Sequence, residues 1–114
     1  IKDRAKDLIK SGGEWISSID LENVIMGHAA VANCAVIAIP HPTWGERPLL
    51  VVVPAGELWP DKTEFDQLLL DHVAKWQLPD AVEFIDALPL TATGKVSKMM
   101  LRKHFSDYVL PDII

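Results

Sequence analysis

The residue with the clearest chemical potential is Lys95, which follows Gly94 in a turn-forming stretch. Pro89 interrupts any preceding strand and Gly94 frees the backbone directly before the lysine, so we expect a loop that carries one ammonium group at its tip. From Leu88 to Phe105 the chain has no acidic residue but has four basic ones, namely Lys95, Lys98, Arg102 and Lys103. In a chain of net charge −5, this local excess of positive charge predicts a nearby anion.

Two common chemistries do not fit the sequence. A P-loop needs a glycine five residues before its Gly-Lys pair and a Ser or Thr after the lysine, but Pro89 and Val96 occupy these positions. A metal centre is not expected in this chain either, because its histidines share no ligand spacing with one another or with Cys34. These histidines are His28, His41, His72 and His104. The chemistry to explain is therefore that of one exposed lysine.

Length and composition describe one globular domain. The chain has 114 residues, of which 49% are hydrophobic, and no apolar run reaches the roughly 20 residues of a membrane span. Cys34 is the only cysteine, so an internal disulfide is impossible and a reducing, cytoplasmic location fits best. Most basic residues lie near the two ends of the chain, while residues 11–87 are strongly acidic, which argues against a nucleic-acid surface.

A small sheet with helices packed on it must position the lysine loop. A turn at Ser11-Gly12-Gly13 predicts a hairpin, continuous apolar runs predict strands buried on both faces, and helical spacing of apolar residues predicts the helices. The expected strands are 7–10, 14–16, 33–39, 49–53 and 82–85, and the expected helices are 18–26, 63–76 and 97–108. This order predicts an α+β fold: a small mixed sheet of about three strands flanked by three helices, plus an N-terminal two-stranded hairpin.

Local signals refine this expectation. Helix starts are indicated by two capping pairs, which are Ser17 with Asp20 and Thr63 with Asp66. An eight-residue connection, 41–48, separates the two apolar strands, and we expect its Trp44-Gly45-Glu46 segment to be a packed turn. Cys34, Met99 and Met100 are expected in the core. The chain opens abruptly and without a methionine, which suggests a piece of a larger protein.

Two stretches together resemble a known superfamily. The lysine loop, with its proline, its small and hydroxyl residues, Gly94-Lys95 and the basic helix, resembles the C-terminal lysine motif of adenylate-forming enzymes. These include acyl-CoA synthetases, peptide-synthetase adenylation domains and beetle luciferases. The opening stretch resembles their hinge motif, with matching positions at Arg4, Lys6, Ile9, Lys10, Gly13, Ile16, Leu21 and Glu22. The form GGEWISSIDLE, followed by apolar strands and a Trp-Gly-Glu loop, is most similar to fatty-acyl and medium-chain acyl-CoA ligases.

The resemblance implies that residues 1–114 form one domain, a C-terminal lid on a larger N-terminal domain that would be its partner. Residues 1–10 would contain the hinge and the start of the hairpin, and residues 88–102 the lysine loop and its helix. The full enzyme would be an acid-thiol ligase that converts a carboxylic acid, expected to be a fatty acid, with ATP, Mg²⁺ and CoA into acyl-CoA, AMP and pyrophosphate through an acyl-adenylate. This chain alone should be inactive and hold no cofactor tightly. Any peripheral membrane contact would belong to the N-terminal domain.

The resemblance also implies roles for single residues in forming the acyl-adenylate and in the movement of the lid. Lys95 would be catalytic, reaching between the substrate carboxylate and the α-phosphate, where an ammonium offsets the negative charge that builds up. Lys6 would lie at the hinge, where the family more often has aspartate. Arg4 would lie near the ribose and phosphate of the nucleotide, although a surface ion pair with Asp3 or Asp7 stays open.

The CoA site is implied at the glycine turn and on the last helix. Gly13, with Glu14 and Trp15 beside it, matches the place where the pantetheine arm of CoA passes close to the backbone, although a plain turn glycine would look the same. Lys98 and Arg102 lie at i and i+4 on the last helix. They are candidates for contacts with CoA phosphates, or for a solvated helix face.

Two other functions stay open from the sequence. A peptide-synthetase adenylation domain would share both motifs, but its lid would serve the pantetheine of a carrier protein instead of CoA. A stand-alone module that binds an anion or a protein partner would also explain the basic segment. The acyl chain length is not encoded in these residues, because the acyl pocket would lie in the N-terminal domain.

Overall fold

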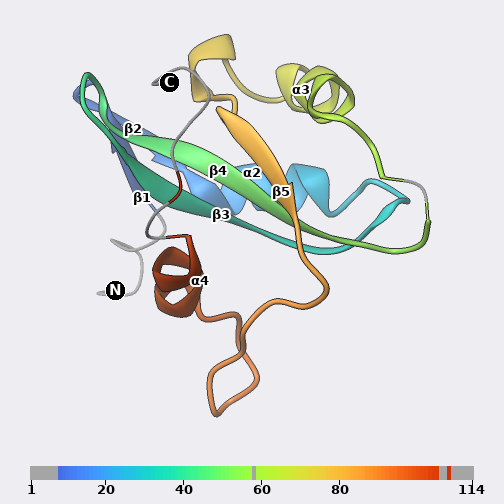
Figure 1. Cartoon of the computed structure of the whole chain (residues 1–114). Helices are drawn as coiled ribbons and strands as arrows, with labels where there is room; N and C mark the ends of the chain where they lie inside the picture. The colour runs from blue at the N-terminus through green and yellow to red at the C-terminus, as the bar shows by residue number, and fades with distance from the viewer. Residues whose placement is uncertain (1–7, 58, 106–107, 109–114) are drawn as a thin grey trace.

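The computed structural model describes residues 8–57, 59–105 and 108, which form one sheet covered by short helices (Figure 1). The strands are β1 (Leu8–Ser11), β2 (Glu14–Ser17), β3 (Val31–His41), β4 (Gly45–Pro54) and β5 (Ala81–Phe84), and the helices are α2 (Ser18–Ile25), α3 (Lys62–Leu70), α4 (Lys98–His104) and the 3₁₀ turn η1 (Lys75–Gln77). The strand order is β2-β1-β4-β3, and β5 pairs with β4 in parallel while the other pairs are antiparallel. The predicted α+β fold with a mixed sheet is confirmed.

The N-terminal hairpin belongs to the same sheet. β1 pairs along its length with β2 and meets β4 at one position, where Ser11 lies opposite Gly45. The sheet therefore has five strands, whereas the sequence predicted about three and a separate hairpin. This junction brings the glycine turn after Ser11 next to the connection between β3 and β4.

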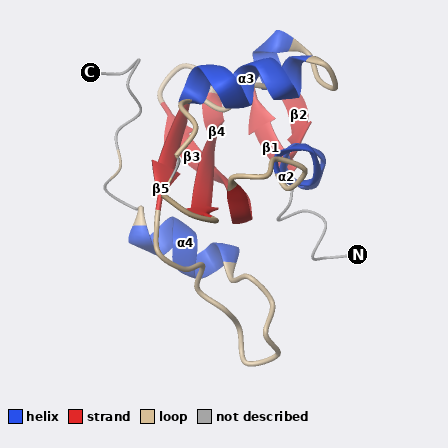
Figure 2. Cartoon of the chain, turned by 90° about the vertical axis from the view of Figure 1, so that its right-hand side faces the viewer, coloured by secondary structure: helices blue, strands red, loops and turns tan. Residues whose placement is uncertain are grey.

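Both faces of β3 and β4 are buried, as their continuous apolar runs predict. On one face, Leu50 packs in a cluster with Leu21 of α2 and Phe65 of α3. On the other face, Ile37 packs in a cluster with Leu101 of α4. Helices α2 and α3 thus cover one face of the sheet and α4 covers the other (Figure 2).

The strands β3 and β4 are longer than predicted, so the expected eight-residue connection shrinks to residues 42–44. Of the two prolines in this stretch, Pro42 lies in the remaining connection, whereas Pro48 lies inside β4, opposite Ala38 of β3. Pro40, just before the stretch, lies in β3, which is an edge strand, where the missing N–H of proline is tolerated. Gly45 has a φ of 87°, which lets the chain re-enter the sheet directly after Trp44.

Side chains cap the helix starts, although one differs from the prediction. Ser17 accepts a hydrogen bond from the backbone N of Asp20 at 3.2 Å, as expected for the cap of α2. Asp61, and not Thr63, caps α3, because its side chain accepts from the backbone N of Glu64 at 2.9 Å. Thr63 is already inside the helix.

Two helices end earlier than predicted. α3 stops at Leu70, whereas the sequence predicted one helix over 63–76, so Trp76 lies in the separate turn η1. α4 ends at His104, whereas the sequence predicted a helix over 97–108. Met99 and Met100 are 67% and 50% exposed, so their placement in the core was wrong. Cys34 is buried, as expected.

Candidate functional site

Lys95 lies in the segment between β5 and α4. This segment forms a tight bend that projects from the body of the domain next to α4 (Figures 1 and 2). A bridge between Leu90 and Val96 closes the bend, and the backbone N of Thr91 donates to the carbonyl of Lys95 at 2.7 Å. Gly94 adopts a φ of 84°, a conformation that strongly favours glycine. Lys95 is exposed, and its ammonium makes no hydrogen bond or ion pair with any residue that the structure describes. The bend therefore presents one cation to an incoming anion.

An internal ion pair attaches the helix after this bend to the body of the domain. Lys98 Nζ lies 2.8 Å from Glu22 Oε2 and donates to Ser18 Oγ at 2.8 Å. The same Glu22 oxygen accepts from the backbone N of Val36 at 2.8 Å. The prediction placed Lys98 beside Arg102 on a face open to CoA phosphates, but the Lys98 side chain is turned inward and only 14% exposed. Arg102 is half-buried and remains the candidate on this helix.

Cys34 lies beside this ion pair but cannot act as a nucleophile at neutral pH. Its Sγ donates to the carbonyl of Glu22 at 3.5 Å. Burial, and secondarily the negative charge of Glu22, raise the pKa of the thiol from 9.0 to about 12, and Lys98 offsets only part of this. The thiolate is the reactive form of cysteine, so this group is chemically inert at neutral pH.

The turn between β1 and β2 contains two glycines with different surroundings. Gly12 and Gly13 have φ values of 59° and 87°. The backbone N of Gly12 donates to the carbonyl of Trp44 at 2.7 Å, and a Cβ at Gly12 would lie 2.7 Å from Trp44 Cε3. Apart from its chain neighbours, a Cβ at Gly13 would meet no atom of the described residues within 4 Å. Gly12 is thus required by packing, whereas Gly13 borders open space where a ligand could approach the backbone.

Glu14 and Trp15 follow the turn and are both exposed. Trp15 is 56% exposed, and Lys10 Nζ lies 5.7 Å from the centre of its ring. These two residues are partners across the hairpin, so the cation lies over an aromatic face that also meets solvent. The predicted pantetheine residues therefore share one open edge of the hairpin.

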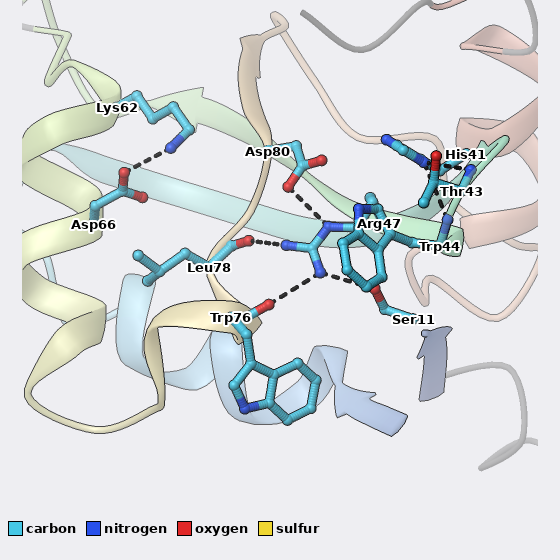
Figure 3. Close-up of polar contacts among 10 residues, drawn as sticks. All are labelled: Ser11, His41, Thr43, Trp44, Arg47, Lys62, Asp66, Trp76, Leu78 and Asp80. Atoms are coloured by element: carbon cyan, nitrogen blue, oxygen red, sulfur yellow. Dashed lines mark hydrogen bonds and ion pairs between the residues drawn. The ribbon is translucent and has the colours of Figure 1, made fainter. Parts of the chain in front are cut away.

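A hollow next to the glycine turn is built around Arg47 (Figure 3). Its volume is about 240 Å³, and its lining residues are Ser11, Trp44, Arg47, Trp76 and Asp80. Trp44 and Trp76 are 50% and 43% exposed. This hollow therefore combines two aromatic side chains and a largely buried guanidinium beside Ser11, the residue directly before the glycine turn.

Residues 20–95 match the family model described as the AMP-binding enzyme C-terminal domain. The chain belongs to this family. It is 56% identical over 107 residues to the 3-methylmercaptopropionyl-CoA ligase of Ruegeria pomeroyi and 57% identical over 108 residues to the long-chain-fatty-acid–CoA ligase of Thermus thermophilus. These matches cover 94% and 95% of this chain but 20% of each relative. The chain thus spans about a fifth of the length of these curated relatives.

Solved structures agree with this assignment. The domain superposes on a fatty acyl CoA synthetase of Mycobacterium tuberculosis with a TM-score of 0.85 and 36% identity, covering 94% of this chain and 21% of that one. It superposes on ATP-bound MatB from Rhodopseudomonas palustris with a TM-score of 0.84 and 33% identity, covering 90% and 20%. The Lys95 bend closes the stretch that the family model matches.

Some predictions for this AMP-binding enzyme C-terminal domain lie beyond what the structure covers. Arg4 and Lys6 fall outside the described residues. Within the part of the chain that is described, no group of His, Cys, Asp and Glu side chains is arranged to hold a metal ion. None of the helices found there is long and apolar enough to cross a membrane.

Sequence patterns did not indicate the hollow beside the glycine turn. Trp44 was expected in a packed turn and Trp76 at the end of a helix over 63–76, and Arg47 had no expected role. Arg47 could have been noticed from the sequence, because it is one of few basic residues in the acidic stretch 11–87 and would need acidic or polar partners. Because its partners come from distant segments, no local pattern could identify them.

Proposed function

We propose that this domain is the mobile lid of an ATP-dependent acyl-CoA ligase. In the first half-reaction a carboxylate attacks the α-phosphorus of ATP, forming an acyl-adenylate and releasing pyrophosphate. In the second, the thiol of CoA attacks the acyl carbon, forming the thioester and releasing AMP. The observation that carries the proposal is the bare Lys95 ammonium at the tip of a projecting bend, in a domain whose relatives include several ligases of CoA with carboxylic acids.

Lys95 would serve the first half-reaction. Its ammonium would lie between the carboxylate and the α-phosphate, where it offsets the repulsion between two anions and the charge that develops in the transition state. A compact and mobile ammonium suits this task, because the lysine side chain can follow the reacting oxygens. Mg²⁺ would enter with ATP, and the N-terminal domain would hold it.

The glycine turn would serve the second half-reaction. The open space beside Gly13 would let the pantetheine arm of CoA pass along the backbone, with Glu14 and Trp15 at the same edge. We assign the contact with CoA phosphates to Arg102 alone, because Lys98 is engaged by Glu22 and Ser18. Lys6 would be the hinge between the two orientations of the lid, and Arg4 would approach the nucleotide.

The acid substrate is proposed to be a fatty or another hydrophobic carboxylic acid. This rests on the names of relatives, which include long-chain and medium-chain fatty-acid ligases and a trans-cinnamate ligase. CoA is proposed as the acceptor for the same reason. A cytoplasmic location is proposed because the buried Cys34 is a free thiol.

The test uses the full-length protein with ATP, Mg²⁺, CoA and a panel of fatty acids of increasing chain length. We expect AMP, pyrophosphate and acyl-CoA to form in equal amounts with at least one acid, and no product from the 114-residue chain alone. Formation of ADP in place of AMP, or no thioester with any acid while a carrier protein becomes acylated, would contradict the proposal.

A further inference from the structure

Arg47 forms a junction of hydrogen bonds beneath the hollow next to the glycine turn. Its Nε donates to Asp80 Oδ1 at 2.9 Å and its Nη1 donates to Ser11 Oγ at 2.9 Å. Nη1 also donates to the carbonyl of Trp76 at 3.0 Å, and Nη2 donates to the carbonyl of Leu78 at 2.9 Å. Figure 3 shows the guanidinium lying among these partners.

This junction joins segments that are distant in sequence. Ser11 is the last residue of β1, directly before the glycine turn, whereas Trp76 lies in η1 and Asp80 directly precedes β5. The backbone N of Asp80 also donates to the carbonyl of Pro48, the residue after Arg47. One side chain therefore sets the distance between the glycine turn and the segment that carries Trp76.

Arg47 is not placed to act as an anion ligand. Four of its N–H groups are already used, its side chain is only 11% exposed, and the Asp80 carboxylate neutralises its charge. A guanidinium can fill this position because its planar fork directs several donors at once, which the single ammonium of lysine cannot do.

The connection between β3 and β4, with the strand residues next to it, contacts the glycine turn on the side opposite Arg47. The ring of Trp44 covers Gly12, and the Glu46 carboxylate accepts from the backbone N of Lys10 at 3.0 Å. His41 Nδ1 accepts from the backbone N of Trp44 at 3.2 Å and so holds this connection in shape. The glycine turn is thus held between Trp44 and Arg47.

We propose that Arg47 is a positioning residue for the second half-reaction, holding the glycine turn and the Trp76 segment at the separation that CoA needs. This inference rests on the proposed function. It requires that loss of the guanidinium fork weakens the use of CoA, while adenylation, which depends on the distant Lys95 bend, stays intact.

The experiment compares Arg47→Lys with the wild type in the full-length enzyme, measuring each half-reaction separately. Arg47→Lys keeps the positive charge but cannot bind all four acceptors. We expect the KM for CoA, measured with supplied acyl-adenylate, to rise about tenfold. ATP–pyrophosphate exchange should change by less than about twofold, because all four hydrogen-bond partners of Arg47 lie outside the Lys95 bend.

The matched control is Lys62→Met, which removes the nearby Lys62–Asp66 ion pair without touching the turn or Trp76. It should leave both half-reactions unchanged. If Arg47→Lys does not fold, Ser11→Ala replaces it as the test variant. It removes one hydrogen-bond acceptor of Arg47 next to the turn and should raise the KM for CoA about threefold.

Equal losses in both half-reactions for Arg47→Lys, or an unchanged KM for CoA in Arg47→Lys or Ser11→Ala, would overturn the inference. These results are distinct from failure of the proposed function, in which the wild-type enzyme itself would form no acyl-CoA.

Discussion

Lys98 of α4 and Glu22 of α2 form an ion pair, with Nζ and Oε2 2.8 Å apart. The two helices cover opposite faces of the sheet, so this ion pair joins them past the edge strand β3. The side chains of Lys98 and Glu22 are only 14% and 18% exposed, and the Glu22 oxygen is also bound by the backbone N of Val36. α4 begins directly after the bend, so this ion pair anchors the base from which Lys95 projects.

Removing this anchor should destabilise the domain. In Lys98→Met, Glu22 keeps one backbone donor but loses its cation in a mostly buried position, so we expect the free energy of unfolding to fall by about 3 kcal/mol. Urea denaturation of the 114-residue chain measures this. Lys103→Met is the control, because Lys103 is exposed on the same helix, and it should change the value by less than about 0.5 kcal/mol. Equal effects of the two variants would show that the ion pair does not anchor α4.

The two glycines of the hairpin turn should differ in their tolerance of alanine. Gly13→Ala places a Cβ in open space at positive φ and should cost about 1 kcal/mol. Gly12→Ala adds a contact of 2.7 Å with the Trp44 ring, so it should cost roughly 1 to 3 kcal/mol more. The urea midpoints of the two variants test this order, and a smaller loss for Gly12→Ala than for Gly13→Ala would contradict the packing described here.

The buried thiol of Cys34 should make stability depend on alkaline pH. Its folded-state pKa is about 12 and its ordinary value is 9.0. Below pH 9 the thiol is therefore protonated in both the folded and the unfolded state, and the free energy of unfolding does not depend on its titration. Above pH 9 the unfolded chain loses the proton first, so stability falls as pH rises towards 12. The window from pH 9 to 10 isolates this effect, because the pKa of Tyr108 is likewise raised, from 10.0 to about 12.

We therefore expect the urea midpoint to fall between pH 9 and 10 in the wild type and to fall less in Cys34→Ala. In the native protein at pH 8, the thiol should also react far more slowly with a thiol reagent than in urea. Rapid modification of the native thiol, or the same slope in Cys34→Ala, would disprove the assigned burial effect.

Sequence patterns predicted the features that local chemistry decides. The continuous apolar runs identified β3 and β4, Ser17 marked the start of α2, and the Gly94-Lys95 pair marked an exposed bend. Each depends on residues close in the chain. For this reason the fold class and the exposure of Lys95 could both be predicted.

Features that depend on distant partners could not be predicted in this way. Lys98 was expected at a surface, but it meets Glu22 of α2, a helix far away in the sequence. Its inward direction and the burial of Leu101 leave Met99 and Met100 exposed on the other side of α4. Likewise, Arg47 binds Ser11 and Asp80 only because the sheet brings β1, β4 and the start of β5 together.

The most direct test of the central claim is the effect of Lys95→Ala on the two half-reactions of the full-length enzyme. ATP–pyrophosphate exchange should fall by about 10²- to 10³-fold, while thioester formation from supplied acyl-adenylate should stay within about threefold of wild type. Lys103→Ala, which removes an exposed lysine near the bend, should leave both rates unchanged. An equal loss in both half-reactions for Lys95→Ala, or no loss of exchange, would contradict the role of Lys95 in adenylation.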